Sequence, residues 1–338
     1  MSTFYSRKGL KKGICAIALV SSVAMPLTPV LATPVQPAAR LAPTDQNTKT
    51  AADYNLFNKN VITKTIDSSP AQSARVGKYI IHLAAASALG KEASTYTIIN
   101  PETMQTVSTG QLQAGGGAHF AANSETGEIL IAATDTNQLE RYTVTEDGQL
   151  SPAQPVSGFN FDPAEETLAM GYNKFTHSWG VLTSKNYITV DSSGLLNSMP
   201  LPDPKTLDPA LANAPDADTS EYYGAQYTHT ANVLAPLPDG SFVYDSGTTI
   251  SNEQGEVQRG YLLHFSKDAV KVFDDGTAIA ERVSYGRVTT TDDGRVYRWS
   301  YLHNSSYQVL SYADGQFTVL NGKTSIQAKG LESIGELF

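Results

Sequence analysis

The chain has 338 residues, with 33 acidic and 24 basic side chains and a net charge of −9. This acidic balance disfavours nucleic acids and anionic membrane surfaces as partners. Cys15 is the single cysteine. Because Cys15 lies within the signal peptide predicted below, the mature protein is expected to have no cysteine, and therefore neither disulfides nor thiolate chemistry.

The first residues have the three parts of a secretory signal peptide. A basic start at residues 7–12 precedes an apolar run over residues 14–25, and Val30 and Ala32 are the small residues that a signal peptidase requires. The apolar run is shorter than the ~20 residues of a membrane-spanning helix. We therefore predict a signal peptide over residues 1–32 and export to the periplasm or beyond the cell, with no membrane span after cleavage. Loss of the four signal cations takes the net charge from −9 to −13.

The mature chain divides into a tail and one domain. Residues 33–50 are rich in Pro, Ala and Thr, which is typical of a flexible linker. From residue 51 to 338, short runs of Tyr, Val, Ile, Thr and Phe alternate with turn residues, and helical periodicity is missing. This pattern predicts an all-β domain.

A strand–turn–strand unit recurs along the domain, with turns near residues 102, 148, 194, 268 and 315. The spacing is about 46 residues, except after residue 194, where a Pro- and Asp-rich insertion at 200–221 accounts for the excess. A second repeated element occurs at residues 122–131, 236–244 and 291–297. Two hairpins per unit make four strands, which is the size of a propeller blade.

We therefore predict a β-propeller of four-stranded blades over residues 51–338. Five units are recognised, and residues 54–66 and 324–338 could supply strands of a shared sixth blade. A five-bladed ring and a truncated seven-bladed ring stay open. The alternative fold is a β-sandwich or a solenoid of hairpins.

One blade, residues 116–156, has the most distinctive sequence. Its distinctive segments are Ala118–Asn123, Glu125–Glu128, Ile129–Ala133, Tyr142–Val144 and Asp147–Leu150. In these segments it resembles a blade of the lactonase-like propellers, which include the 6-phosphogluconolactonase type and the exported surface-antigen type. For the lactonases, the resemblance implies charged residues, with Arg and His prominent, around the channel mouth. Only His119 matches such a position.

Three histidines, His119, His177 and His229, fall near the start of a predicted innermost strand, and Trp179 lies beside the second. Innermost strands line the channel of a propeller, so these four residues are predicted to form a ligand-binding site at its mouth. Several imidazoles in one funnel could also hold a transition metal or a haem. Ordinary hydrogen-bonded histidines at strand ends are the alternative, and no resident cofactor is predicted.

The insertion contributes a weaker candidate. Asp216 and Asp218 stand at alternate positions and could share a calcium ion, although the rest of a calcium loop is missing. The alternative is a solvated loop at the rim. Because the insertion precedes a blade, it could also fold over the channel mouth as a lid.

The chain contains no acid–base pair or nucleophile in a recognisable sequence context. We therefore predict a binding or scaffold protein, not an enzyme, whose partner is a protein, a glycan or a small molecule. The alternative is an exported lactonase-like hydrolase or a propeller enzyme that depends on a metal or haem.

Overall fold

The computed structural model describes residues 71–84, 93–115, 119–133, 138–160, 162, 165–214, 217–219, 222–224, 232–252, 255–273, 287–300 and 306–325. The predicted signal peptide, the linker and the segment 54–66 lie outside these residues. So do residues 326–338 and the candidates His229 and Asp216.

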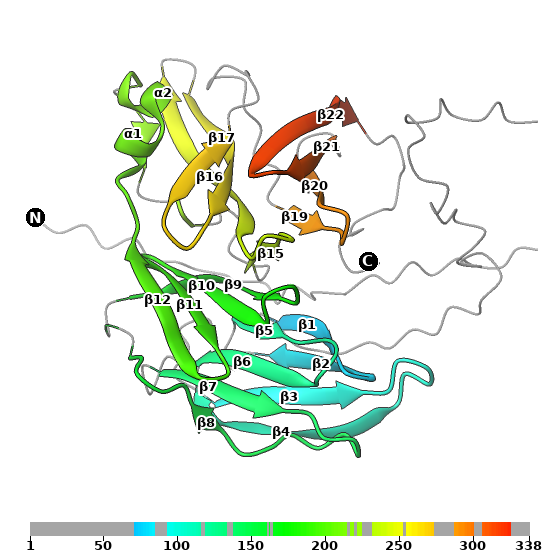
Figure 1. Ribbon diagram of the computed structural model, residues 1–338. Coiled ribbons are helices and arrows are strands. Elements are labelled where there is room, and N and C mark those ends of the chain that lie inside the picture. The colour runs from blue at the N-terminus through cyan, green and yellow to red at the C-terminus, as the bar shows by residue number, and fades with distance from the viewer. Residues whose placement is uncertain are drawn as a thin grey trace, which may run out of the picture. The chain divides into compact units, whose positions relative to one another are not determined.

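The described residues form five sheets, which we number in chain order (Figure 1). Each is an antiparallel meander, as predicted. Sheet 1 contains β1 (Ala71–Val76), β2 (Tyr79–Ala84), β3 (Ala93–Ile99) and β4 (Thr106–Gly115). Sheet 2 contains β5 (Phe120–Ala122), β6 (Glu128–Ala133), β7 (Gln138–Thr143) and β8 (Gln154–Pro155). Sheet 5 contains β19 (Arg287–Thr290), β20 (Arg295–Ser300), β21 (Ser306–Ala313) and β22 (Gln316–Ser325).

Sheets 3 and 4 each take an additional short strand. Sheet 3 contains β9 (Thr167–Asn173), β10 (Ser178–Thr183), β11 (Asn186–Asp191) and β12 (Gly194–Pro200), with β14 (Asn232–Val233) parallel to β9. Sheet 4 contains β15 (Ala235–Pro236), β16 (Phe242–Asn252), β17 (Gly255–Phe265) and β18 (Val270–Phe273), with β13 (Ala217–Asp218) paired to β16. Gly171 makes the β9–β14 approach possible, because a Cβ there would lie 1.9 Å from the Leu234 carbonyl oxygen.

The repeat predicted from the sequence corresponds to these hairpins. All five copies of the first element are the turns between the third and fourth strands, from β3–β4 to β21–β22. The three copies of the second element are the turns β5–β6, β15–β16 and β19–β20. The predicted four-stranded unit is therefore confirmed.

The sheets pack face to face in chain order through apolar clusters. Sheets 1 and 2 share a cluster that includes Ile81 and Ile129, and sheets 2 and 3 share one that includes Leu130 and Trp179. Two further clusters join sheet 3 to sheet 4 and sheet 4 to sheet 5. The first strands also contact one another in order, β1 with β5, β5 with β9, β9 with β15 and β15 with β19. This is the packing of a β-propeller, in which each blade covers the faces of its neighbours.

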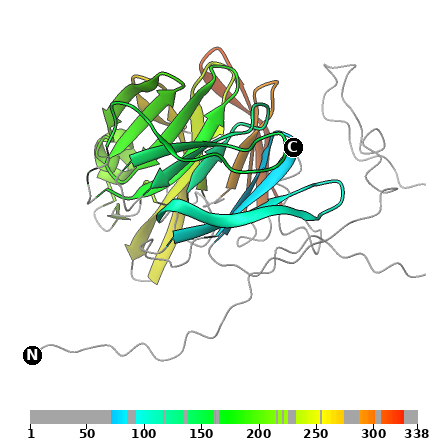
Figure 2. The ribbon, with the colours of Figure 1, turned by 90° about the horizontal axis from the view of Figure 1, so that it is seen from below.

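A four-stranded meander has two unlike ends. We call the end with the first and third turns of each sheet the hairpin end. We call the other, where the second turn lies and where the chain leaves for the next sheet, the connection end. At the hairpin end, turns of neighbouring sheets contact each other: Lys78 pairs with Glu146 at 2.9 Å, and Ser108 donates a hydrogen bond to the Gly148 carbonyl. Figure 2 gives a second view of the sheets, turned by 90°.

The insertion at residues 200–221 lies at the connection end and contains two short helices, α1 (Pro204–Leu207) and α2 (Pro209–Ala212). Asp203 and Asp208 cap them by accepting bonds from backbone N–H groups, and proline follows each Asp at the first helical position. The Asp–Pro pairs of the sequence are thus helix starts. Leu211 of α2 is fully buried, as is Tyr222 directly after the insertion, so the segment is not simply the solvated rim loop considered above.

Candidate functional site

The clearest polar grouping surrounds the β9–β10 turn at the hairpin end. The sequence predicted His177 at the start of an innermost strand, but the structure places it in the turn after β9, directly before β10. The difference arises because β9 begins at Thr167, ten residues before His177. His177 therefore lies at the opposite end of its sheet from the predicted position.

His177 has an unusual backbone conformation, with a φ of 51°. The equivalent positions of the sister turns β5–β6, β15–β16 and β19–β20 are Gly127, Gly240 and Gly294, with φ values of 81°, 91° and 79°. A residue with a Cβ is strained in this left-handed region, whereas glycine is not. Sheet 3 thus keeps a histidine where the repeat elsewhere keeps glycine.

The structure joins His177 to Trp179 through Tyr172. The Tyr172 hydroxyl lies 3.1 Å from Nδ1 of His177, and the Tyr172 ring lies 5.0 Å from the Trp179 ring, centroid to centroid. Burial, followed by the nearby charges of Glu125 and Glu128, raises the pKa of Tyr172. The hydroxyl therefore stays protonated at neutral pH beside the imidazole. Because Glu125 and Glu128 belong to the β5–β6 turn, their effect on Tyr172 also shows that the turn of sheet 2 lies near that of sheet 3.

Trp179 is only 1% exposed. It packs between sheets 2 and 3, and the Arg141 guanidinium lies 5.3 Å from its ring centroid. Arg141 in turn donates to the Asp191 carbonyl of sheet 3 at 2.6 Å. Trp179 therefore supports Tyr172 and the turn from beneath.

Exposed side chains complete the surface of this turn. Phe175 is 38% exposed, and the Lys174 ammonium lies 5.6 Å from its ring centroid. Lys174 also forms an ion pair of 2.5 Å with Asp292 in the β19–β20 turn. Asn173, fully buried, holds the turn by accepting a bond from the Phe175 N–H and donating to the Leu237 and Ser241 carbonyls. A rigid base thus presents an aromatic ring, an imidazole and an ion pair to solvent.

His119 does not belong to this grouping. It immediately precedes β5 and so lies at the connection end, as predicted. Its Nδ1 atom is buried and makes no hydrogen bond within the described structure, and burial lowers the pKa of its imidazole to about 4. His119 is therefore neutral at physiological pH. The predicted site of four residues divides into His177 with Trp179 and, at the other end, His119.

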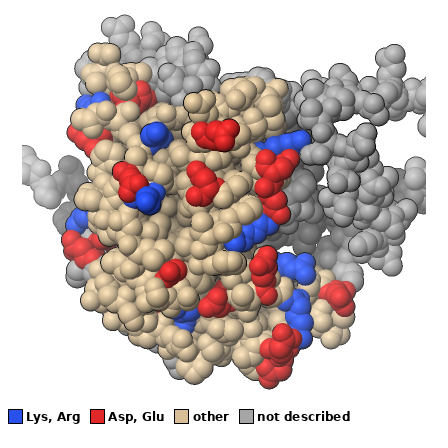
Figure 3. Space-filling view, in the orientation of Figure 1, with Lys and Arg blue, Asp and Glu red and all other residues tan. Residues whose placement is uncertain are grey.

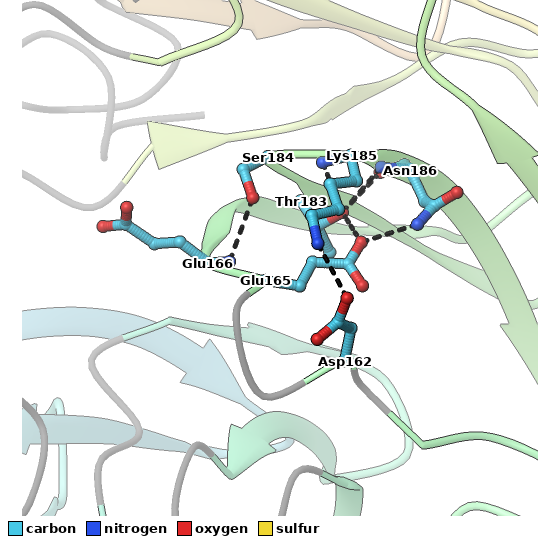
Figure 4. A network of polar contacts seen from close by, with 7 residues as sticks. All are labelled: Asp162, Glu165, Glu166, Thr183, Ser184, Lys185 and Asn186. Atoms are coloured by element: carbon cyan, nitrogen blue, oxygen red, sulfur yellow. Dashed lines mark hydrogen bonds and ion pairs between the residues drawn. The ribbon is translucent and has the colours of Figure 1, made fainter.

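A polar network holds the connection end of sheet 3 (Figure 4). Glu165 accepts hydrogen bonds from the Thr183 hydroxyl and from Nδ2 of Asn186, the latter at 2.8 Å, and Lys185 pairs with Asp162 at 2.7 Å. These contacts fasten the segment before β9 to the β10–β11 turn. Lys185 and Asp162 neutralise each other, and the Glu165 carboxylate is bonded by neutral groups of the same sheet, so local structure explains the network.

A serine, a histidine and an aspartate also meet at the hairpin end of sheet 4. Nε2 of His264 lies 2.7 Å from Oγ of Ser241, whose hydroxyl donates to Asp239, and the Tyr312 hydroxyl also bonds to Asp239. In a catalytic triad the carboxylate is hydrogen-bonded to the imidazole and orients it. Here the Asp239 carboxylate instead accepts a hydrogen bond from the Ser241 hydroxyl. Burial lowers the pKa of His264. The arrangement ties sheet 4 to sheet 5 and does not activate a nucleophile; sequence reasoning had not identified it.

Of the two calcium candidates, the structure describes Asp218 but not Asp216. Asp218 is exposed in β13. Among the described residues, no three His, Cys, Asp or Glu side chains gather as metal ligands would. Within the same residues, no helix has the length and apolar character needed to cross a membrane.

No family model matches the chain, and no characterised protein matches it in sequence. Solved structures with a similar fold include a proposed 6-phosphogluconolactonase from Bacteroides uniformis, at 11% identity and a TM-score of 0.43, covering 78% of this chain and 72% of that one. Its counterpart from Bacteroides fragilis matches at 10% identity with a TM-score of 0.43, over 78% and 73% of the two chains. The Cps50 (Swd1) β-propeller domain of Myceliophteria thermophila matches at 11% identity with a TM-score of 0.40, over 73% and 71%. No conclusion about family or activity follows from scores this low, and the propeller fold is established by the order and packing of the five sheets.

Proposed function

We propose that this protein is an exported β-propeller that binds a protein partner through the β9–β10 turn. The observation that carries the proposal is His177, whose backbone is strained and whose side chain is exposed, at a position where three sister turns have glycine. Strain of this kind persists where surrounding contacts impose it, and it gathers at functional sites. Phe175 beside it offers the exposed aromatic anchor that protein interfaces favour.

The chemistry of the turn supports binding and not catalysis. His177 contacts a tyrosine hydroxyl and no carboxylate or nucleophile among the described residues, and Lys174 is engaged by Asp292. On the face drawn in Figure 3, acidic and basic side chains are interspersed, so a partner recognised by one sign of charge alone is not favoured there. An aromatic ring that projects from a tight turn suits a pocket on another protein.

The test is photo-crosslinking in cells that export the protein, with a photoreactive amino acid in place of Phe175. The matched control carries it in place of Val319, which is 39% exposed on β22 against 38% for Phe175. We expect a discrete adduct from position 175 and none from position 319. We also expect the exported protein itself to begin at Thr33, as N-terminal sequencing would show. Equal labelling from both positions, or no adduct from position 175, would refute the proposal.

His177→Gly separates function from stability. Glycine relieves the strain of the left-handed backbone, so the free energy of unfolding, measured in urea, should be about 1 kcal/mol higher for the variant than for the wild type. Removal of the imidazole should at the same time abolish the adduct at position 175. A variant that is more stable and still crosslinks fully would show that His177 has no role in binding.

A further inference from the structure

Four Asp–Gly pairs lie in turns that the structure describes, and one of them differs from the other three. The four are Asp147–Gly148, Asp239–Gly240, Asp293–Gly294 and Asp314–Gly315. An aspartate followed by glycine is prone to a spontaneous rearrangement of the backbone, because glycine leaves its amide nitrogen unshielded and its backbone free to turn. The rearrangement needs a free carboxyl group, a free amide nitrogen and room for the turn to move.

Hydrogen bonds hold the carboxylates of the first three aspartates. The donors are hydroxyl groups: Thr145 for Asp147, Ser241 and Tyr312 for Asp239, and Thr291 for Asp293. Asp314 is exposed, and its carboxylate has no hydrogen-bond or ion-pair partner in the part of the chain that the structure describes. Of the four carboxyl groups, that of Asp314 is therefore the one free to reorient.

The amide nitrogens follow the same division. In the first three pairs the glycine N–H donates to the carbonyl three residues earlier: Gly148 to Thr145 at 2.9 Å, Gly240 to Leu237 at 3.0 Å and Gly294 to Thr291 at 3.0 Å. Gly315 instead lies in the two-residue turn between β21 and β22, where Ala313 pairs with Gln316. Its N–H makes no hydrogen bond within the described structure, and the residue is exposed.

The space around the glycines differs as well. A Cβ placed on any of the first three would lie between 2.5 and 2.7 Å from an atom of another turn or strand, whereas a Cβ on Gly315 would have nothing within 4 Å. Asp314 also has a left-handed φ of 52°, which a residue with a Cβ holds at a cost. Packing therefore fixes the first three turns, while the β21–β22 turn can change conformation without displacing its neighbours.

We propose that Asp314 is a modification site at which the backbone rearranges spontaneously to isoaspartate. The Gly315 nitrogen attacks Cγ of the protonated Asp314 carboxyl group, an N–Cγ bond forms, and the carboxyl hydroxyl leaves with the amide proton as water. Water then opens the five-membered succinimide. Cleavage of the N–Cγ bond restores aspartate, whereas cleavage of the bond between the nitrogen and the α-carbonyl carbon leaves a backbone that runs through Cβ and Cγ, beside a free α-carboxylate. Water is the only co-reactant.

The product lengthens the turn by one backbone atom at the point where β21 joins β22. Tyr312 and Phe317 form the next pair along this hairpin, with their ring centroids 4.7 Å apart, and the Tyr312 hydroxyl bonds to Asp239 of sheet 4. Isoaspartate at residue 314 thus loosens the hairpin that joins sheet 5 to sheet 4. The site is separate from the β9–β10 turn and does not depend on the function proposed for it.

The test is to incubate the folded protein for weeks near neutral pH in water enriched in heavy oxygen, and then to map its tryptic peptides. Each passage through the succinimide introduces one solvent oxygen atom, and electron-transfer fragmentation distinguishes isoaspartate from aspartate. Asp314 should be labelled about tenfold faster than the other three aspartates, because each of those must first lose its hydrogen bonds. In urea, where all four pairs are free, the four rates should converge.

Asp314→Glu is the control variant. Its longer side chain would have to close a six-membered ring, which forms far more slowly, so label and isoaspartate at position 314 should disappear. The same peptide contains Asn321–Gly322, within β22, and label that stays at the wild-type level in the variant would come from Asn321 instead. That result would refute the proposal, as would labelling of Asp314 in the folded protein no faster than that of Asp147, Asp239 and Asp293.

Discussion

The two ends of the sheets follow different rules. At the hairpin end, short turns carry Asn, Asp and Gly at recurring positions, and these turns bond to those of the next sheet. At the connection end, the links range from the two residues 184–185 to the insertion that precedes β14. The repeat therefore constrains one end closely, because each turn must fit its neighbour, while the other end can accept added chain.

Each end also carries departures from the repeat. At the hairpin end they are single residues in left-handed turn positions, His177 in sheet 3 and Met104 in sheet 1. At the connection end the departure is a whole segment, which contributes Leu211 to the core, with Tyr222 directly after it. His177 belongs to the binding site proposed above. In a repeat fold, equivalent positions of the copies can be compared, so a position that differs from its equivalents is a candidate functional site.

The largest change in the free energy of unfolding should come from a substitution that tests whether the insertion belongs to the core. Leu211→Ala removes a fully buried side chain and should lower the free energy of unfolding by about 2–5 kcal/mol. Leu196→Ala on the edge strand β12, where the side chain is 54% exposed, should change it by less than about 0.5 kcal/mol. Urea unfolding measures both. Equal, small effects would mean that the insertion is an appendage.

The pH dependence of stability should reveal His119 at the connection end, a half-buried histidine whose Nδ1 atom is enclosed. The pKa of His119 is lowered to about 4 in the folded protein, against ~6.5 in an unfolded chain, so its contribution is complete above pH ~6.5. As pH falls toward 4, the unfolded state takes up the proton first, and about 3 kcal/mol of stability should be lost.

His119→Gln should flatten that part of the profile, measured by urea unfolding between pH 7 and 4. Burial also lowers the pKa values of His82 and His264, so a shallower slope should remain in the variant. An unchanged slope would mean that the His119 imidazole is solvated and would contradict the enclosure of its Nδ1 atom.

The smallest effect should separate conformational strain from crowding at the hairpin end. Gly127 and Gly315 both have left-handed φ values, 81° and 76°, but a Cβ at Gly127 would lie 2.8 Å from the Val144 carbonyl oxygen, whereas Gly315 has open space around it. Gly315→Ala should cost about 1 kcal/mol from strain alone, and Gly127→Ala about 2 kcal/mol or more. Thermal unfolding compares them, and equal losses would mean that the turn of sheet 2 yields to the added carbon.

The sequence predicted part of the candidate site and misplaced part of it. His177 and Trp179 were identified, and Tyr172 does connect them, but the turn was assigned to the wrong end of the sheet. Alignment of Asn123 with Asn173 would have placed His177 opposite Gly127 and revealed the turn. Asp314 had no such signal, because its pair with Gly315 has the same sequence as the Asp–Gly pairs whose turns are held by hydrogen bonds.

What the sequence by itself determined was the repeating unit. Alternating apolar residues and Asp–Gly or Asn turns act over a few neighbours, so they specify hairpins and hence the four-stranded sheet. What only the tertiary structure decided was which exceptions meet: that Lys174 reaches Asp292, that Asp245 pairs with Arg298, and that the insertion covers β16. These contacts join residues that are far apart in the chain, and they depend on how the blades pack, which no local pattern encodes.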